Sequence, residues 1–111
     1  MKTTGISRFA LCLFAALSTG AIAQDVRTQE GENLAATCAA CHGTAGHSIG
    51  VMPVLAGIDK ATMFAAMQAF KNGQRPGTIM PQLAKGYSDL QIATLAEFFS
   101  KQQPEPQART K

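Results

Sequence analysis

The sequence predicts a small all-helical domain with about three main helices, and three observations support this prediction. Apolar residues recur at the i, i+3, i+4 and i+7 spacing of a buried helix face, at Ile92, Leu95, Ala96 and Phe99. Two segments rich in glycine and proline, 43–58 and 73–81, separate the expected helices. Two cysteines and a histidine lie close together within residues 38–42, where the first expected helix ends.

Residues 38–42 read Cys-Ala-Ala-Cys-His, which is the pattern of a c-type haem attachment site. Positions three apart share a helix face, so Cys38 and Cys41 can both reach the vinyl groups of one porphyrin. His42 follows directly and can offer a neutral imidazole nitrogen to the iron. The motif therefore predicts one covalently bound haem c with His42 as an axial ligand.

Three other interpretations of the motif are weaker. A structural zinc site takes four ligands, but the sequence has no second cysteine pair and only one other histidine, His47. A thioredoxin-like redox pair requires a βαβ pattern around the cysteines, and none is visible. A plain disulfide is compatible with an exported protein but leaves His42 unexplained.

Residues 1–23 have the pattern of a secretory signal peptide that is cleaved after Ala23. Lys2 and Arg8 form a basic region, a short apolar run covers residues 9–17, and Ala21-Ile22-Ala23 is a small-x-small site. A retained membrane anchor is less favoured because the apolar run is brief. We therefore expect a periplasmic domain at 24–111, without a stable membrane span.

Removal of Lys2 and Arg8 lowers the formal charge from +3 to +1. The basic isoelectric point thus belongs mainly to the precursor and does not indicate a nucleic-acid partner.

The first helix is expected from about Thr28 to Cys41, with Gly31 marking the close approach of another helix. Gly43 permits the positive φ of a helix end. In the loop that follows, His47 is interpreted as a solvated surface group, with a rival role as an iron ligand. A ligating histidine usually donates its second ring N–H, and the carbonyl of Pro53 is the expected acceptor.

The second helix is expected from about Lys60 to Asn72, capped by Asp59 and ended by Gly73. Met63 and Met67 lie on its apolar face and are interpreted as core residues rather than iron ligands.

A rigid loop is expected at 73–81, because two glycines and two prolines exclude a helix or a central strand there. Met80 lies in this loop, away from any helical stripe, and is predicted to be the sixth ligand of the iron. Pro76 and Pro81 limit the freedom of the loop and help to keep a weak iron–sulfur bond closed. Arg75 has two interpretations, a partner of a haem propionate or a solvated side chain.

The third helix is expected to begin with the capping box at 88–91, in which Ser88 is the N-cap. We expect this helix to cross the first near Gly31. The polar tail from 102 to 111 contains Pro104 and Pro106 and is expected to be disordered.

These motifs together resemble a class I cytochrome c. The order is Cys-x-x-Cys-His, then Pro-x-Leu-x-Gly at 53–57, then the Met-Pro pair and an aromatic C-terminal helix. The segments 70–76 and 84–89 are most similar to the cytochrome subunits of flavocytochrome c sulfide dehydrogenases. The resemblance implies an all-helical fold around one haem c, with His42 and Met80 as axial ligands. A single attachment motif excludes two-haem members.

The sequence therefore predicts a periplasmic one-electron carrier and not an enzyme. The resemblance implies a redox partner, which could be a flavoprotein sulfide dehydrogenase subunit that contains FAD. Met52, Ile79 and Pro81 are the candidate contacts. One alternative is a free carrier to a terminal oxidase or another partner. Alternatives from other classes are a haem enzyme or gas sensor with an open sixth position, and a disulfide protein without haem.

Overall fold

The computed structural model of the protein describes residues 19–104, and every regular element within that range is helical. The three longer helices are α1 (Thr19–Ala36), α3 (Lys60–Lys71) and α5 (Asp89–Ser100). The shorter elements are α2 (Ala39–His42), the 3₁₀ turn η1 (Thr44–Gly46) and α4 (Met80–Lys85). The predicted all-helical fold with three main helices is confirmed.

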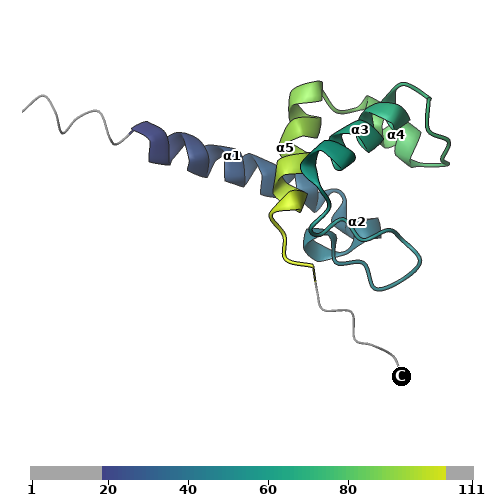
Figure 1. Ribbon diagram of the computed structural model, residues 1–111, viewed down its shortest axis with the longest axis horizontal. Coiled ribbons are helices and arrows are strands. Elements are labelled where there is room, and N and C mark those ends of the chain that lie inside the picture. Colours follow the sequence, from purple (N-terminus) through teal and green to yellow (C-terminus); the bar gives the residue numbers. More distant parts are fainter. Residues whose placement is uncertain (1–18, 105–111) are drawn as a thin grey trace, which may run out of the picture.

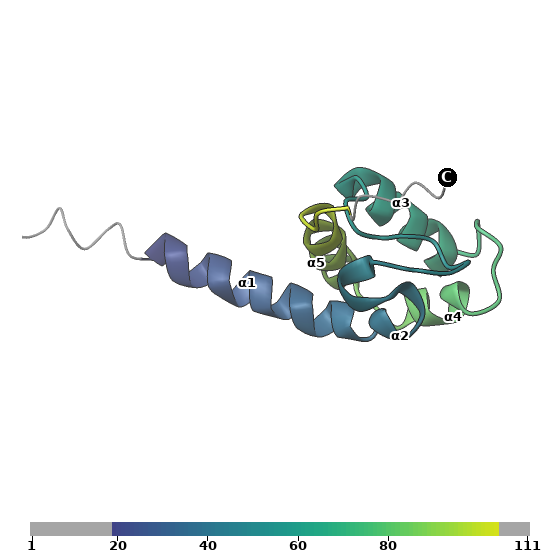
Figure 2. The ribbon, with the colours of Figure 1, turned by 90° about the horizontal axis from the view of Figure 1, so that it is seen from below.

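α5 is the central element of the domain. It crosses the C-terminal half of α1 on one side and packs against α3 on the other, while α4 lies beside α3 (Figure 1). The N-terminal half of α1 extends away from the other helices, as both views show (Figures 1 and 2). The largest fully buried side chains all belong to α5, and they are Phe99, Ile92 and Leu95.

The crossing of α1 and α5 occurs at Gly31, as expected. Gly31 is buried, and a Cβ atom at this position would lie 3.2 Å from the Cβ of Phe98. The missing side chain lets the two backbones approach, which offsets the helix propensity that glycine loses. The C-terminal end of α1, and with it the cysteine motif, is thereby placed against α5.

The predicted boundaries of the first helix, 28–41, are wrong. The helix begins earlier, at Thr19, and it ends at Ala36 rather than continuing through the cysteines. The amide of Thr37 donates to the carbonyl of Leu34, and the Thr37 hydroxyl donates to the same oxygen. These bonds to the residue three positions back tighten the last turn, so the chain restarts as the separate helix α2.

The capping predictions are confirmed at two helices. Asp59 Oδ1 accepts from the amide of Thr62 at 2.9 Å at the start of α3. At the start of α5, Ser88 and Gln91 form both bonds of a capping box. These residues bond the first amides of their helices, which have no partner within the helix itself.

The segment 73–81 is a loop only as far as Ile79, and the expectation that it excludes a helix is wrong for its last two residues. Met80 and Pro81 open α4, with the proline in the first helical turn. Proline is tolerated there because its missing amide N–H has no helical partner to lose. Met80 is therefore fixed at a helix start.

Two predictions concern the ends of the chain, namely the signal peptide at 1–23 and the disordered tail at 102–111. Residues 1–18 and 105–111 lie outside the described residues, and so do most of the expected signal peptide and the outer tail. At the start of the tail, Gln102 is half-buried and its side chain donates to the carbonyl of Phe98 at 3.0 Å. The tail thus leaves the domain later than expected. None of the helices described is long and apolar enough to cross a membrane.

We predict that Glu97 makes stability depend on pH. Hydrogen bonds from Lys101 and Lys60 lower the pKa of the Glu97 carboxyl to about 2. A lowered pKa means that the contribution is present above the ordinary value near 4.5 and is lost as the pH falls toward 2. Because all three side chains are largely exposed, Glu97→Gln should cost only about 0.2–1 kcal/mol at neutral pH.

Urea unfolding of the holoprotein from pH 7 to pH 2 measures this effect. The difference between wild type and Glu97→Gln should close below about pH 4.5, where the wild-type carboxylate loses its advantage. Glu32→Gln on α1 is the matched control. A difference that stayed constant down to pH 2 would contradict the assignment.

Candidate cofactor site

Cys38 and Cys41 lie at the junction of α1 and α2, and both are free thiols. Cys38 is half-buried against the core, whereas Cys41 is exposed. Burial raises the pKa of the Cys38 thiol, and the neighbouring Thr37 hydroxyl partly opposes this effect. The two sulfurs come from one short helix and are available for covalent attachment.

The imidazole of His42 is buried, with only 7% of the residue exposed. Its Nδ1 lies 2.8 Å from the carbonyl oxygen of Pro53, which is the contact expected from the sequence. Because a carbonyl can only accept, Nδ1 carries the proton and Nε2 keeps its lone pair. A buried imidazole with one nitrogen fixed in this way is prepared to act as a metal ligand.

The loop after His42 folds back to make this contact possible. The carbonyl of Gly46 accepts from the amides of Leu55 and Ala56 at 2.9 and 3.2 Å. Gly46 has a φ of +81°, and a Cβ there would meet Leu55, Ala56 and Phe99 within 3 Å. Only glycine fits this position, so the return of Pro53 to His42 depends on it.

Met80 comes from a different part of the fold. It is half-buried at the first position of α4 and packs against the hydrophobic core. Figures 1 and 2 show that α4 and α2 both lie on the side of the domain opposite the free end of α1. In Figure 1 the two helices stand apart on this side, with α4 beside α3 and α2 below them.

The other candidate ligands have different surroundings. Met63 and Met67 are buried at 4% and 5% exposure, as expected for core residues. Met52 is exposed in the loop. The expectation that His47 is a solvated surface group is wrong, because the residue is half-buried and its Nδ1 has no hydrogen-bond partner among the described residues. The loop folds inward at Gly46, so the imidazole ring of His47 is partly shielded from solvent.

Arg75 and Tyr87 make contacts that sequence reasoning did not identify. The guanidinium of Arg75 lies 4.6 Å from the centre of the Phe70 ring, so the side chain is stacked rather than freely solvated. The hydroxyl of Tyr87 lies 2.7 Å from that of Thr37, next to Cys38. The carbonyl of Tyr87 also accepts from Lys71. No helical periodicity marks these contacts, because the first lies in a loop and the second joins residues 50 positions apart.

The residues around these side chains fit a large apolar cofactor. Among the residues whose side chains the structure describes, eight large hydrophobic ones are exposed. Six of these lie in the two segments beside His42 and Met80, and they are Ile49, Val51, Met52, Val54, Ile79 and Leu83. Scattered exposed apolar residues are common, but a concentration in two segments indicates a surface that another group covers. Two thiols for covalent attachment, with an imidazole and a thioether as potential iron ligands, are the residue types that a c-type haem requires.

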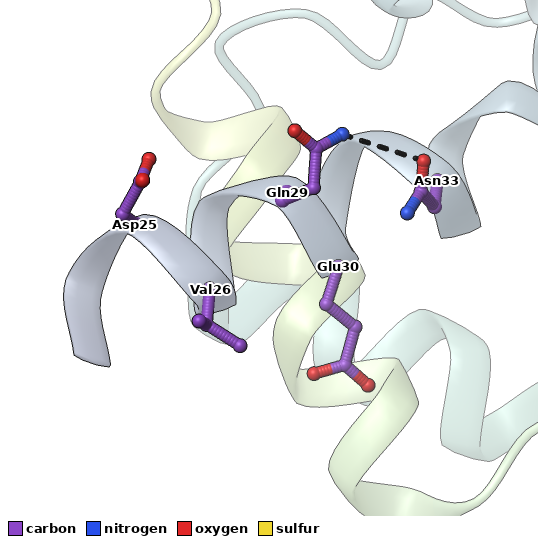
Figure 3. Close-up of a pocket in the computed structure, with 5 residues that line it drawn as sticks. All are labelled: Asp25, Val26, Gln29, Glu30 and Asn33. Carbon is purple, nitrogen blue, oxygen red and sulfur yellow. Dashed lines mark hydrogen bonds between the residues drawn. The ribbon is translucent and has the colours of Figure 1, made fainter. Parts of the chain in front are cut away.

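A separate surface hollow lies along the middle of α1. It is lined by exposed side chains of that one helix, namely Asp25, Val26, Gln29, Glu30 and Asn33 (Figure 3). The only interaction drawn there joins the Gln29 amide to Asn33 Oδ1 at 3.5 Å. This hollow has no side chain in common with the cysteine motif or Met80, and it is not the cofactor site.

The known proteins that this chain resembles are consistent with a haem site. Residues 28–103 match the family model described as cytochrome c. The chain belongs to the cytochrome c family. Members of the family bind haem c covalently, and a single domain of this size suits one haem.

Several cytochromes are similar to this chain. The cytochrome subunit of sulfide dehydrogenase from Chlorobaculum tepidum is 42% identical over 74 residues, which cover 67% of either chain. Cytochrome c-554(548) from Halomonas halodenitrificans is 36% identical over 66% of this chain and 93% of its own length. A thiosulfate dehydrogenase electron acceptor from Stutzerimonas stutzeri is 36% identical over 57% of this chain and 31% of its own. The names of the first and third relatives place cytochromes of this kind in electron transfer.

We predict that loss of the attached haem unfolds the domain. Within the described part of the chain only three large side chains are fully buried, so a porphyrin would supply much of the apolar surface that holds this small cytochrome together. The Cys38→Ala, Cys41→Ala double variant should lose most of its helical circular dichroism. Cys41→Ala alone is the control, because it leaves one thiol for attachment. A cooperative thermal transition of the haem-free double variant would contradict the prediction.

Proposed function

We propose that the protein is a periplasmic single-haem cytochrome that transfers one electron at a time and is not itself an enzyme. The observation that carries this proposal is the hydrogen bond from His42 Nδ1 to the carbonyl of Pro53. It leaves His42 Nε2 as a fixed, neutral donor next to two free thiols.

Each residue of the site has one task in this proposal. Cys38 and Cys41 would hold the haem c through two thioether bonds. His42 and Met80 would bind its iron, and the haem would supply a ferrous–ferric couple. A methionine ligand raises the reduction potential relative to a second histidine. Pro53 holds the orientation of the His42 ring.

Arg75 keeps its candidate task as a partner of a haem propionate. Its stacking on Phe70 places the guanidinium in the loop before Met80, and the N–H groups in the plane of the guanidinium remain able to bond a haem propionate.

We predict that Met80→Ala keeps the haem attached but opens the sixth position. The oxidised protein should lose the weak far-red absorption band of a methionine–iron bond, and its reduction potential should fall. Met52→Ala is the matched control, because Met52 is an exposed methionine in the other loop. Visible spectroscopy and redox titration measure both changes. A native spectrum for Met80→Ala would mean that another side chain is the ligand.

Carbon monoxide binding to the reduced wild-type protein separates this proposal from a haem enzyme or gas sensor. Those functions need an open sixth position, so their wild-type protein would bind carbon monoxide readily in the reduced state. A six-coordinate carrier would bind it slowly, because Met80 must leave first.

We further propose that the electron donor is a flavoprotein subunit of a sulfide dehydrogenase. The similarity to the Chlorobaculum tepidum cytochrome subunit supports this partner. Residues 43–58 contain no Asp, Glu, Lys or Arg, so docking there would rest on apolar contact rather than charge steering. Met52 lies in the segment that follows His42, Ile79 directly precedes Met80, and Pro81 follows Met80 in α4, so the three candidate contacts lie in the segments that flank the candidate ligands.

We predict that Ile79→Ser slows reduction of the haem by sulfide in the complex with the flavoprotein, by weakening apolar contact. Val26→Ser is the matched control, since Val26 is 62% exposed but lies on the free half of α1. Affinity purification of the native protein, followed by stopped-flow reduction with sulfide, tests the partner. A monomer that sulfide reduces no faster than an unrelated cytochrome c would leave only a free carrier to an oxidase or another partner.

A further inference from the structure

The chain between α3 and Met80 turns back onto the end of α3. The amide of Gly73 donates to the carbonyl of Phe70 at 3.2 Å, and the amides of Gln74 and Arg75 both donate to the carbonyl of Ala69 at 2.8 and 3.0 Å. Gly73 has a φ of +73°, which allows the reversal. The first half of the loop is thus bonded to the last turn of α3.

The second half of the loop is held by the ring of Phe70. The Arg75 guanidinium stacks over this ring at 4.6 Å from its centre. A Cβ atom on Gly77 would lie 3.3 Å from Phe70 Cε1 and 3.1 Å from Pro81 Cδ. The ring of Phe70 and the ring of Pro81 therefore both border the space that a side chain on residue 77 would occupy.

This series of contacts ends at Met80. Pro81 is its neighbour in the first turn of α4, and the proline ring can move away from Gly77 only if the start of α4 moves with it. Phe70 itself is half-buried and packs against the core, so it is a firm support. The position of Met80 is coupled to α3 through Gly77 and Pro81.

The loop on the other side of the site lacks such support at its tip. A Cβ atom on Gly50 would have no heavy atom within 4 Å, and Ile49 and Val51 are fully exposed. The tip of the loop after His42 thus lacks the close packing that is present beside Gly77.

We propose that Phe70 and Gly77 are positioning residues that hold Met80 in place as the axial ligand. This inference rests on the proposed function, in which Met80 binds the iron. In this proposal an external ligand binds only after Met80 has moved, and that movement carries Pro81 with it because the two residues are adjacent at the start of α4. The space that Phe70 and Pro81 border beside Gly77 would then influence how readily external ligands compete with the thioether.

The test measures the affinity of the oxidised holoprotein for imidazole, together with the far-red band. Gly77→Ala adds one methyl group between Phe70 and Pro81 and should shift the start of α4 by a few tenths of an ångström. We expect the imidazole affinity to rise about tenfold, which corresponds to about 1.4 kcal/mol. The far-red band should weaken while the haem stays attached. Gly50→Ala is the matched control and should leave both values unchanged.

Two variants at position 70 keep the proposal testable if Gly77→Ala does not accumulate. Phe70→Leu keeps an apolar side chain but removes the ring, and should raise the imidazole affinity. Phe70→Tyr keeps the ring and should restore the wild-type value. Equal affinities for the Leu and Tyr variants would overturn the proposal, and so would a Gly77→Ala protein that behaves like Gly50→Ala. A lower melting temperature without a change in imidazole affinity would also overturn it, since that result describes a purely structural role.

The wild-type protein separates this inference from the proposed function. A wild type without the far-red band would mean that Met80 is not the ligand, and the proposed ligation itself would fail. A wild type with the band, but with variants unchanged, would refute only the positioning role.

Discussion

The crossing of α1 and α5 at Gly31 is the contact on which the rest of the domain depends. It brings the backbone of α1 against Phe98, and the same helix α5 contributes the three largest fully buried side chains. α1 carries the cysteine motif at its C-terminal end, and α3 packs on the other side of α5 and carries the support for Met80. One close helix contact thus fixes the relative positions of the two halves of the site. A side chain at residue 31 would separate them.

The two candidate iron ligands, His42 and Met80, are held in different ways. His42 is oriented by a single hydrogen bond to a loop carbonyl, and the loop reaches it because Gly46 folds the chain back. Met80 is oriented by ring and glycine contacts that begin at Phe70. A nitrogen ligand needs a defined proton position, which a hydrogen bond supplies. A thioether has no proton to place, so packing alone determines where it lies.

The sequence predicted those features that depend on residues close together in the chain. The capping box at Ser88, the Asp59 cap and the buried stripe on α5 each lie within one or two helical turns, and all three are confirmed. Three features were not predicted, and they are the break after Ala36, the helical start at Met80 and the inward position of His47. Each depends on a contact or a turn that no local periodicity encodes. The break, for example, involves Thr37, whose hydroxyl meets that of Tyr87. For the site, the motif residues and the Pro53 acceptor were identified beforehand, whereas the supporting role of Phe70 was visible only in three dimensions.

The bond between Thr37 and Tyr87 makes the segment beside Cys38 depend on a distant part of the chain. It joins residues 50 positions apart, so this segment has its final geometry only when the turn before α5 is in place. In that geometry Cys38 is half-buried, and burial raises the pKa of its thiol. A change at Tyr87 would therefore alter the surroundings of the cysteine motif, although the two are far apart in the sequence.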